Sequence, residues 1–394
     1  MVLRRPLATL AAAGALVLAL LGAGTDSAAA SPAQATANPL TGNGMWIWYV
    51  SRSHGGNVDA IAARAHRSNI TTVFVKSGDA AKPWSQFNPG LINALHARGL
   101  KVCAWQFIYG VLPYAEADVG AASVAAGADC LVLDVEGQYE GKYASADRFM
   151  QSLRARVGAD YPLGLASFPY TDYHPALPYS VFLGPNGAQY NLPQMYWKAI
   201  GTSVAAVFAH TFQFNRPYGR PIAPLGQTYA NPRPKQVRKF RRWALSYNSL
   251  GVSWWSWQST GKKQWRALRG NVAPLGAPPV LYPTLTVGSK GDLVVWAQQH
   301  LDGAGFTTPI GGIYSTTTAA SVSSFQTSRG IPATGIIDAN TWPALLAVAP
   351  TYVAWGTAGY APARSAAAGG GIIAPDSAGL PAVRDEIPGP RRRR

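Results

Sequence analysis

The segment GADCLVLDVEG, residues 127–137, holds a short apolar run that ends in two acidic residues. The run before Asp134 is typical of a strand buried on both faces, as in a parallel sheet. Because strand side chains alternate between faces, Asp134 and Glu136 point the same way, about 6.6 Å apart along the chain. An unpaired carboxylate in an apolar strand costs several kcal/mol. Two of them on one face indicate a catalytic site, the alternative being loop caps or ion pairs with Lys or Arg.

Seven further apolar runs resemble this one, and segments with helical spacing separate them. The eight runs are 45–50, 72–76, 101–107, 130–136, 162–168, 192–197, 221–227 and 251–258. The helical segments are 58–67, which follows an Asn57 cap, and 89–98, 116–126, 144–157, 203–212 and 235–247. Eight strands that alternate with helices over about 220 residues predict an α/β protein with a (β/α)8, or TIM, barrel. An open doubly wound sheet is the alternative, but the glycine-rich phosphate loop that usually follows its first strand is missing from this sequence.

Polar and aromatic residues gather where the predicted strands end, and in such a barrel the active site lies at these carboxyl ends. Glu136 and Asp134 are the expected catalytic residues. The predicted substrate-binding residues are Trp48, Asp79, Trp105, Tyr170, Asp172, Gln194, Tyr196, Trp197, Gln227, Trp255 and Trp257. Aromatic rings can stack on sugar faces while amides and hydroxyls bind sugar hydroxyls, so the set predicts a carbohydrate site. Any single Trp of the set can instead belong to the barrel core.

The chain has 394 residues, enough for two or three domains, and its first 30 are typical of a secretory signal peptide. Arg4 and Arg5 precede an apolar run that is short for a membrane span, which makes an N-terminal anchor the weaker alternative. We therefore expect a secreted protein that is extracellular or associated with the cell wall. Cys103 and Cys130 lie in neighbouring predicted strands, where they form either a disulfide or two buried thiols.

The formal net charge is +16 although only 13% of the residues are charged. No Asp or Glu occurs between Tyr173 and Gly291, while Lys and Arg recur from Lys198 to Lys290. This imbalance indicates an anionic partner such as a polymer of the cell envelope or wall. A basic surface that serves only solubility is one alternative. Nucleic acid is a weaker one, because the chain is predicted to be exported and carries no nucleic-acid-binding motif.

Composition divides the rest of the chain. We expect a small-residue linker at 31–42, the barrel at 43–270, and a Pro/Gly linker at 271–283. Residues 284–348 show helical spacing around Val294 and Leu301 and again around Val322 and Phe325, which predicts a small all-α domain of three helices. Residues 349–394 are rich in Gly, Ala and Pro and end in four arginines, so we expect a disordered tail there.

The C-terminal block has a specific pattern of spaced residues. They are Leu285, Gly288, Gly291, Val294, Gln298, Leu301 and Gly305, and then Thr317, Ala320, Val322, Phe325, Gln326, Gly330, Gly335, Thr341, Trp342 and Leu345. The pattern resembles the three-helix peptidoglycan-binding domain that accompanies many bacterial wall hydrolases. It departs from that family at Gly311-Gly312, where Asp-Gly is usual. The resemblance implies peptidoglycan as a partner, and a generic helical docking module is the alternative.

The barrel segment also resembles known families. Its LVLDVEG run and its closing WWSWQST are similar to strands of Chalaropsis-type lysozymes, which end their fourth strand in Asp-x-Glu. Those enzymes begin their first strand with Gly-Ile-Asp, whereas residues 44–47 of this chain are GMWI. The spacing of Asp129, Asp134 and Glu136 resembles the fourth strand of chitinase-like hydrolases, but Val132 replaces a middle Asp, and QMY at 194–196 only approximates their Met-x-Tyr. Both resemblances imply a glycoside-hydrolase-like barrel.

Glycoside hydrolysis needs an acid that protonates the leaving oxygen and a second group that stabilises or attacks the anomeric carbon. We assign the acid to Glu136, at the strand tip, with a pKa raised by burial and by its neighbour. Asp134 would hold the charge of the pair or orient an N-acetyl group. Since strands six to eight bring no carboxylate, with Asp79 and Asp172 the only distant acids, the sequence favours a substrate-assisted mechanism. In it the sugar's own 2-acetamido oxygen attacks, and Tyr196 or Gln194 steadies it.

The sequence thus predicts a secreted cell-wall glycoside hydrolase, lysozyme- or chitinase-like, that acts on a β-1,4-linked N-acetylated glycan and foremost on peptidoglycan. The alternative is a non-catalytic barrel that binds wall glycan with a vestigial active site. We expect no cofactor and no metal, because the six His show no metal-ligand spacing. We also expect the protein to be a monomer and to have no nucleic-acid partner.

Overall fold

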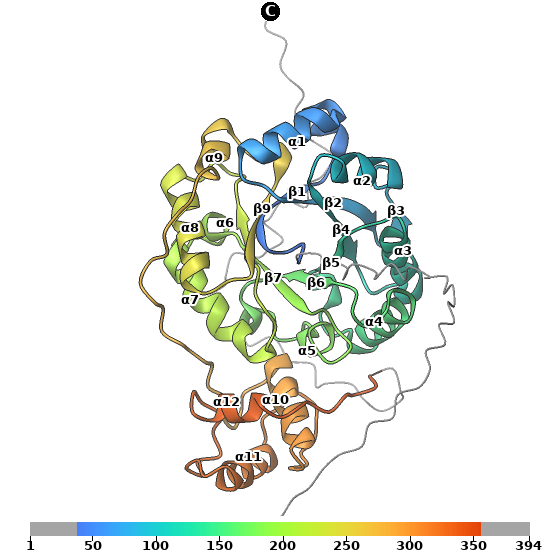
Figure 1. Ribbon diagram of the computed structural model, residues 1–394. Coiled ribbons are helices and arrows are strands. Elements are labelled where there is room, and N and C mark those ends of the chain that lie inside the picture. The colour runs from blue at the N-terminus through green and yellow to red at the C-terminus, as the bar shows by residue number, and fades with distance from the viewer. Residues whose placement is uncertain (1–37, 356–394) are drawn as a thin grey trace, which may run out of the picture. The chain divides into compact units, whose positions relative to one another are not determined.

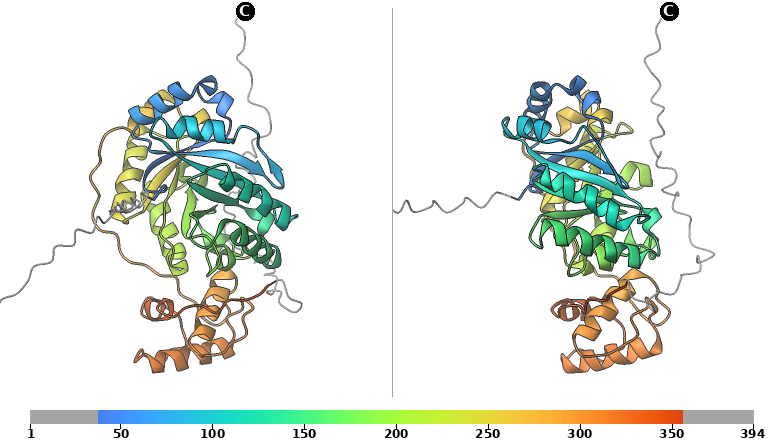
Figure 2. Two further views of the ribbon diagram at one scale, coloured as in Figure 1. Left: turned by 45° about the vertical axis from the view of Figure 1, so that its right-hand side comes forward. Right: turned by 90° about the vertical axis from the view of Figure 1, so that its right-hand side faces the viewer.

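The computed structural model describes residues 38–355, so the predicted signal peptide and the terminal arginines lie outside the described residues. Eight strands pair in parallel with their neighbours. They form a ring with the helices outside it (Figures 1 and 2). The strands are β1 (Gly42–Ile47), β2 (Thr72–Asp79), β4 (Lys101–Ile108), β5 (Cys130–Val135), β6 (Leu163–Ser167), β7 (Tyr190–Met195), β8 (Leu225–Gln227) and β9 (Gly251–Trp255). β1 pairs with both β2 and β9, which closes the ring. The predicted (β/α)8 barrel is confirmed.

The helices of the barrel include six that lie close to their predicted positions and three short ones, at 179–182, 197–200 and 262–267, that were not predicted. They are α1 (Val58–Arg67), α2 (Pro89–His96), α3 (Pro113–Ala125), α4 (Tyr143–Val157), α5 (Tyr179–Phe182), α6 (Trp197–Ile200), α7 (Val204–Asn215), α8 (Pro234–Ser246) and α9 (Lys262–Ala267). The Asn57 side chain caps α1 by accepting a hydrogen bond from the Ala60 N–H, as the sequence predicts. A short hairpin strand, β3 (Lys82–Pro83), follows β2 and was not predicted. Among residues 38–355, no helix combines the length and apolar character that crossing a membrane requires.

Strand side chains alternate between two cores. On β5, Leu131 and Leu133 face outward and pack under the helices, whereas Cys130 and Val132 face the barrel interior. The same alternation places Asp134 on the interior face, since it lies two residues beyond Val132. The period of two along this strand therefore decides that the acidic residues point into the barrel.

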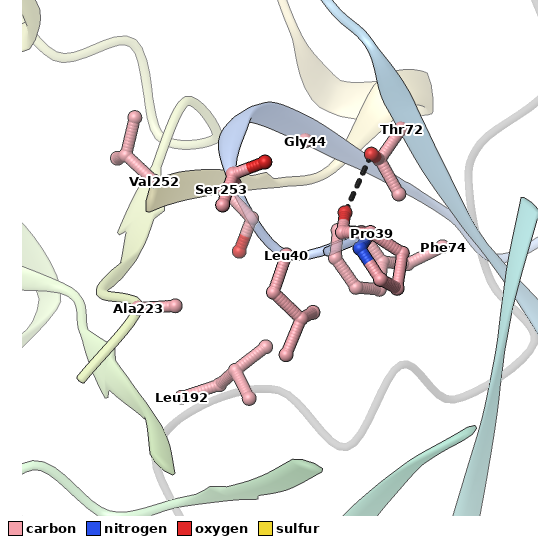
Figure 3. Close-up of a pocket in the computed structure, with 10 residues that line it drawn as sticks. Pro39, Leu40, Gly44, Thr72, Phe74, Leu192, Ala223, Val252 and Ser253 are labelled. Atoms are coloured by element: carbon pink, nitrogen blue, oxygen red, sulfur yellow. Dashed lines mark hydrogen bonds between the residues drawn. The ribbon is translucent and has the colours of Figure 1, made fainter. Parts of the chain in front are cut away.

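The amino end of the barrel is closed by the residues that precede β1. Leu40 is 4% exposed and packs in one cluster with Phe74 and Leu192 (Figure 3). The Thr72 hydroxyl donates a hydrogen bond of 2.7 Å to the carbonyl oxygen of Pro39. The predicted linker at 31–42 therefore extends too far, because residues 38–42 belong to the barrel.

A disulfide joins Cys103 of β4 to Cys130 of β5, and the structure thereby decides between the two alternatives left open by the sequence. The two residues are direct register partners on neighbouring strands, with Cα atoms 4.6 Å apart. Both face the barrel interior.

Glu116, near the start of α3, is fully buried and organises the loop before it. Its carboxylate accepts hydrogen bonds of 3.0 to 3.3 Å from four successive backbone N–H groups, those of Tyr109, Gly110, Val111 and Leu112. Such a cradle of donors matches a carboxylate with two acceptor oxygens, and it makes Glu116 a structural loop anchor.

Replacing Glu116 with Gln is expected to lower the free energy of unfolding by about 1 to 3 kcal/mol, because the new amide group faces N–H donors and leaves them buried without an acceptor. Denaturant unfolding of the full chain measures this change. The matched control is Glu140→Gln, which removes a half-exposed ion pair with His174 and should cost less than about 1 kcal/mol. Equal losses in the two variants would contradict the anchoring role.

The C-terminal region contains α10 (Asp292–Gly303), α11 (Thr316–Ser328) and α12 (Thr341–Leu346), in agreement with the predicted three helices. Two buried glutamines fix its loops. Gln298 accepts hydrogen bonds from the backbone N–H groups of Gly311 and Gly312, and Gln326 accepts one from Gly335. The loop at Gly311-Gly312, where the sequence departs from its family, is thus held through backbone atoms that any residue would offer.

Residues 349–355, which we call the C-terminal strap, are packed rather than disordered, so the predicted tail begins too early. The Tyr352 hydroxyl donates to Asp147 of α4 at 2.6 Å, and Trp355 is 2% exposed with its ring 4.6 Å from that of Tyr143. The strap is also tied to α10, since the backbone N–H of Thr351 donates to the carbonyl of Gln299.

Asp292, the first residue of α10, lies in a buried cluster of hydrogen-bond donors. Its carboxylate accepts from the hydroxyls of Tyr143, Ser180 and Tyr218 and from the backbone N–H of Ser180, at 2.6 to 2.9 Å. Burial raises the pKa of Asp292 to about 6, and the hydrogen bonds from Ser180, Tyr143 and Tyr218 act in the opposite direction.

Candidate active site

Asp134 and Glu136 stand at the carboxyl end of β5, at the edge of the barrel where parallel strands place their functional residues. Asp134 is 6% exposed, whereas Glu136 follows the last strand residue and is partly exposed. The deeper carboxylate is therefore shielded, and the outer one can meet a bound molecule.

Gln194 of β7 joins the two carboxylates. Its side-chain amide nitrogen donates a hydrogen bond of 2.9 Å to Asp134 Oδ1 and one of 3.1 Å to Glu136 Oε1. The strand between them, β6, carries Ala166 in register with Asp134, and this small interior side chain leaves room for Gln194 to reach across. The structure thus brings Gln194, a predicted substrate-binding residue, into contact with both predicted catalytic residues.

Both carboxyl groups hold their protons more tightly than free side chains do. Burial, followed by the negative charge of Glu136, raises the pKa of Asp134 well above its ordinary value, while Lys76 acts against this. Burial also raises the pKa of Glu136, opposed by the hydrogen bond from Gln194 and by His174. Two carboxylates so close cannot both ionise freely, so the pair keeps a proton at higher pH than a single acid would.

Four tryptophans fill the barrel interior beside the acidic pair. Trp46, Trp48, Trp105 and Trp255 come from β1, the end of β1, β4 and β9, with ring centroids 5.4 to 5.9 Å apart. Trp46 and Trp105 are 1% exposed and form the floor, whereas Trp48 and Trp255 are partly exposed. Of the predicted stacking residues, Trp48 and Trp255 are thus the two that a ligand can touch.

Lys76 of β2 lies inside this aromatic cluster. Its ammonium nitrogen is 4.6 Å from the ring centroids of Trp48 and Trp84 and 4.8 Å from that of Trp105. It also forms an ion pair of 2.5 Å with Asp79. The predicted ligand-binding Asp79 is therefore occupied by Lys76 and, on its other oxygen, by the Tyr109 hydroxyl at 3.1 Å.

Two tyrosines complete the carboxyl edge near the acidic pair. Tyr196 is 6% exposed, belongs to the interior cluster, and its ring stands edge-on to that of Tyr229 at 5.4 Å. Burial raises the pKa of both phenols, and the charge of Glu136 adds to this effect for each of them. Tyr196 lies two residues beyond Gln194, whose amide contacts both carboxylates, and Tyr229 packs against Tyr196.

The remaining predicted ligand contacts lie elsewhere. Tyr170 stacks on His210 at 3.9 Å, and Asp172 pairs with the same His210, on the helical side of the sheet. Trp197 is fully buried against Phe240 of α8, and Trp257 packs on Trp265. These aromatic side chains serve the outer core, because their positions along the strand ends face the helices rather than the interior.

Gln227, also predicted to bind substrate, has a structural task. It is fully buried, and its side-chain oxygen accepts hydrogen bonds from the backbone N–H groups of Lys198 and Ala199 at the start of α6. The structure thus corrects the prediction for this residue.

Trp84 was missed by the sequence analysis. It follows the short strand β3 and meets Lys76 across the carboxyl edge. The ring of Tyr49 lies 5.3 Å from it. A Trp in a loop offers no periodicity, so only the proline beside it, which marks a turn, signalled a structured segment. Within residues 38–355, no group of three or more His, Cys, Asp or Glu residues is placed to hold a metal ion.

Residues 290–345 match the family model named "Putative peptidoglycan binding domain". The C-terminal region is thus a peptidoglycan-binding domain. The match covers α10, α11 and all but the last residue of α12, and it confirms the resemblance seen in the sequence. The domain points to an association of the chain with the cell wall.

Several solved structures resemble the chain over somewhat more than half of its length. A GH18 chitinase from Pseudoalteromonas aurantia has 13% identity and a TM-score of 0.42, over 57% of this chain and 97% of that one. The spore cortex-lytic enzyme SleL of Bacillus cereus has 12% identity and a TM-score of 0.44, over 58% of this chain and 73% of that one. A chitinase from Chromobacterium violaceum has 12% identity and a TM-score of 0.42, over 58% and 98%. A search of curated proteins finds no match to the sequence.

Proposed function

We propose that the barrel is a glycoside hydrolase that acts at the cell wall on a β-1,4-linked N-acetylated glycan, with peptidoglycan as its main polymer. The observation that carries the proposal is the pair Asp134 and Glu136, bridged by Gln194 at 2.9 and 3.1 Å at the carboxyl edge of the barrel. Burial raises the pKa values of the pair, which favours retention of the proton that glycoside hydrolysis requires of its general acid.

Glu136 is the proposed general acid. It is the more exposed of the two, and its pKa is raised. Within residues 38–355 its side chain accepts a hydrogen bond from the neutral amide of Gln194 and forms no ion pair with Lys76 or an Arg. A cation bound to Glu136 would favour the ionised form and spoil the acid. Lys76 is instead paired with Asp79, which leaves the proton of Glu136 available to a leaving oxygen.

The second group is proposed to come from the substrate. Between Tyr173 and Gly291 the sequence has no Asp or Glu, so β7, β8 and β9 bring no carboxylate that could act as nucleophile or base. Asp134, two residues below Glu136, would orient the 2-acetamido group of the sugar so that its oxygen attacks the anomeric carbon. Tyr196 or Gln194 would steady that group, and the contacts of Gln194 with both carboxylates support this role.

Unsatisfied polar groups support a sugar ligand at this edge. The Trp48 indole N–H and the Tyr229 hydroxyl are buried and have no hydrogen-bond partner among the described residues. Buried donors without partners are rare in proteins and suggest that a ligand or water completes them. Both groups belong to rings that contact the aromatic cluster or Tyr196, beside the acidic pair.

The test is the release of reducing ends from purified peptidoglycan and from chitin by the full chain. We expect release from both N-acetylated polymers, with peptidoglycan the better substrate because the C-terminal domain holds the barrel against it. The control polymer is cellulose, which lacks the 2-acetamido group and should not be cleaved. Cleavage of cellulose at an equal rate would contradict the substrate-assisted mechanism.

A binding protein without turnover is the second candidate, and Lys76 favours it. The ammonium group lies over the faces of Trp48, Trp84 and Trp105, and it therefore occupies surfaces that could otherwise stack on sugar rings. Retained binding to peptidoglycan with no release from either N-acetylated polymer would establish this function in place of the hydrolase.

A further inference from the structure

Helices α8 and α9 present a dense group of basic side chains on the outside of the barrel, where the two helices lie side by side (Figure 1). We call this group the basic face. Its members are all exposed; they are Arg233, Lys235, Arg238, Lys239, Arg242, Lys262, Lys263, Arg266 and Arg269. The candidate active site uses none of them.

The helix period aligns these charges. Lys235, Arg238, Lys239 and Arg242 recur at intervals of three and four residues, so they lie along one side of α8, while Val237 and Phe240 are buried on the other. The row from the first to the last of them spans about 10 Å at 1.5 Å per residue. Like charges at these spacings repel each other and weaken an isolated helix.

No carboxylate relieves this repulsion within the described part of the chain. None of the nine side chains has an Asp or Glu within ion-pair distance, and neither helix contains an acidic residue. Asp59, the acidic residue of α1, forms its ion pair with Arg98 and not with a residue of the basic face. The pKa of the buried Arg241 is lowered by burial and, next, by the charge of Arg238. An anionic partner that neutralises these side chains would remove the repulsion and explains why the basic face carries no carboxylate.

We propose that the basic face binds an anionic cell-wall polymer whose charges lie on phosphodiester groups. A chain with one charge in every repeat can contact the α8 row and the α9 residues together, which a single small anion cannot do. Arg and Lys both bind phosphate oxygens well. The assignment of the polymer to the wall rests on the proposed function, in which the peptidoglycan-binding domain brings the chain there.

The composition of the basic face separates this partner from single-stranded nucleic acid. Proteins that hold single strands combine positive charge with exposed aromatic rings on which bases stack. On α8 and α9, the exposed positions carry Lys and Arg together with Leu245, and no aromatic side chain among them is fully exposed. The face thus offers charge without a stacking platform.

The experiment measures binding of the full chain to immobilised poly(glycerol phosphate), at low and at high salt, for the wild type and two charge-matched variants. The first variant combines Arg238→Gln with Lys239→Gln. The control combines Lys82→Gln with Arg156→Gln, which removes two exposed positive charges elsewhere on the barrel. We expect the first variant to bind on the order of tenfold more weakly at low salt and to lose much of its salt dependence, while the control stays near the wild type.

Parallel arms use peptidoglycan stripped of phosphate polymers, double-stranded DNA, and vesicles of phosphatidylglycerol. Stripped peptidoglycan should be bound and cleaved equally by all three proteins, so a failure of the hydrolase proposal is seen separately from a failure of this one. Equal weakening in both variants would overturn the proposal, because only net charge would then matter. Tighter binding to DNA or to the vesicles than to the polymer would also overturn it and assign the face to that partner.

Discussion

Glu136→Gln is expected to reduce glycan cleavage by a factor of about 10² to 10⁴, the usual contribution of a general acid. Glutamine keeps the size of the side chain and can still contact Gln194 after the amide of one of them rotates, so the fold should persist. What is lost is the proton that the raised pKa of Glu136 retains for the leaving oxygen. The measurement is reducing-end release from peptidoglycan by wild type and variant at equal concentration.

The control for Glu136→Gln is Asp118→Asn, which removes an exposed carboxylate from its pair with Arg156 and should leave cleavage unchanged. Retention of peptidoglycan binding by both variants shows that the loss is chemical. Full activity of Glu136→Gln would show that another residue is the general acid and would contradict the assignment to Glu136.

Asp292→Asn is expected to flatten the dependence of stability on pH. In the folded chain the pKa of Asp292 is raised to about 6, above its ordinary value, so the folded state holds this proton more tightly than the unfolded state. The resulting stability is fully present below about pH 4 and is lost as the pH rises through about 6. For wild type, a pKa difference of this size corresponds to about 3 kcal/mol between the two ends of the range.

Denaturant unfolding at pH 4, 5.5 and 7 measures this effect. Asparagine cannot ionise, so the loss of stability with rising pH should be smaller in the variant by up to about 3 kcal/mol. Asp134 and Glu136 contribute in the same direction, since their pKa values are also raised, and they remain in both proteins. The matched control is Asp302→Asn, which removes a half-exposed carboxylate from the same helix. Parallel curves for wild type and Asp292→Asn would contradict the role of the buried carboxylate.

The architecture of the barrel was open to prediction because each strand is a buried apolar run between helical segments. The run before Asp134 and the Asn57 cap illustrate this, since periodicity and capping are local properties of the sequence. The packing of residues 38–42 and of the strap at 349–355 was not predictable in the same way. Leu40 and Trp355 are buried by contacts with distant residues, and no local sequence pattern predicts their burial.

The residues of the candidate site likewise fall into those that a local sequence pattern predicts and those whose position depends on distant contacts. Asp134 and Glu136 could be paired from the sequence because strand alternation puts them on one face of β5. Gln194 could be proposed for the same edge because it lies near the end of β7, but its contacts with both carboxylates depend on tertiary folding. Trp197 and Trp257 were predicted at the site but lie in the outer core, because the chain turns directly after the strand ends and alternation no longer applies. Trp84 was missed for the opposite reason, since a loop side chain reaches the site only through tertiary folding.

The strap at 349–355 bears on how far this binding domain is modular. The family match ends at residue 345, but Val353 and Trp355 share a buried cluster with Val295 of α10 and Tyr143 of α4. A designer who transplants the domain by its homologous limits would cut away part of its packing and leave an apolar patch open to water. A transplanted domain therefore needs residues beyond the homologous limits. Part of the surface that buries its apolar side chains is supplied by the barrel, through Tyr143.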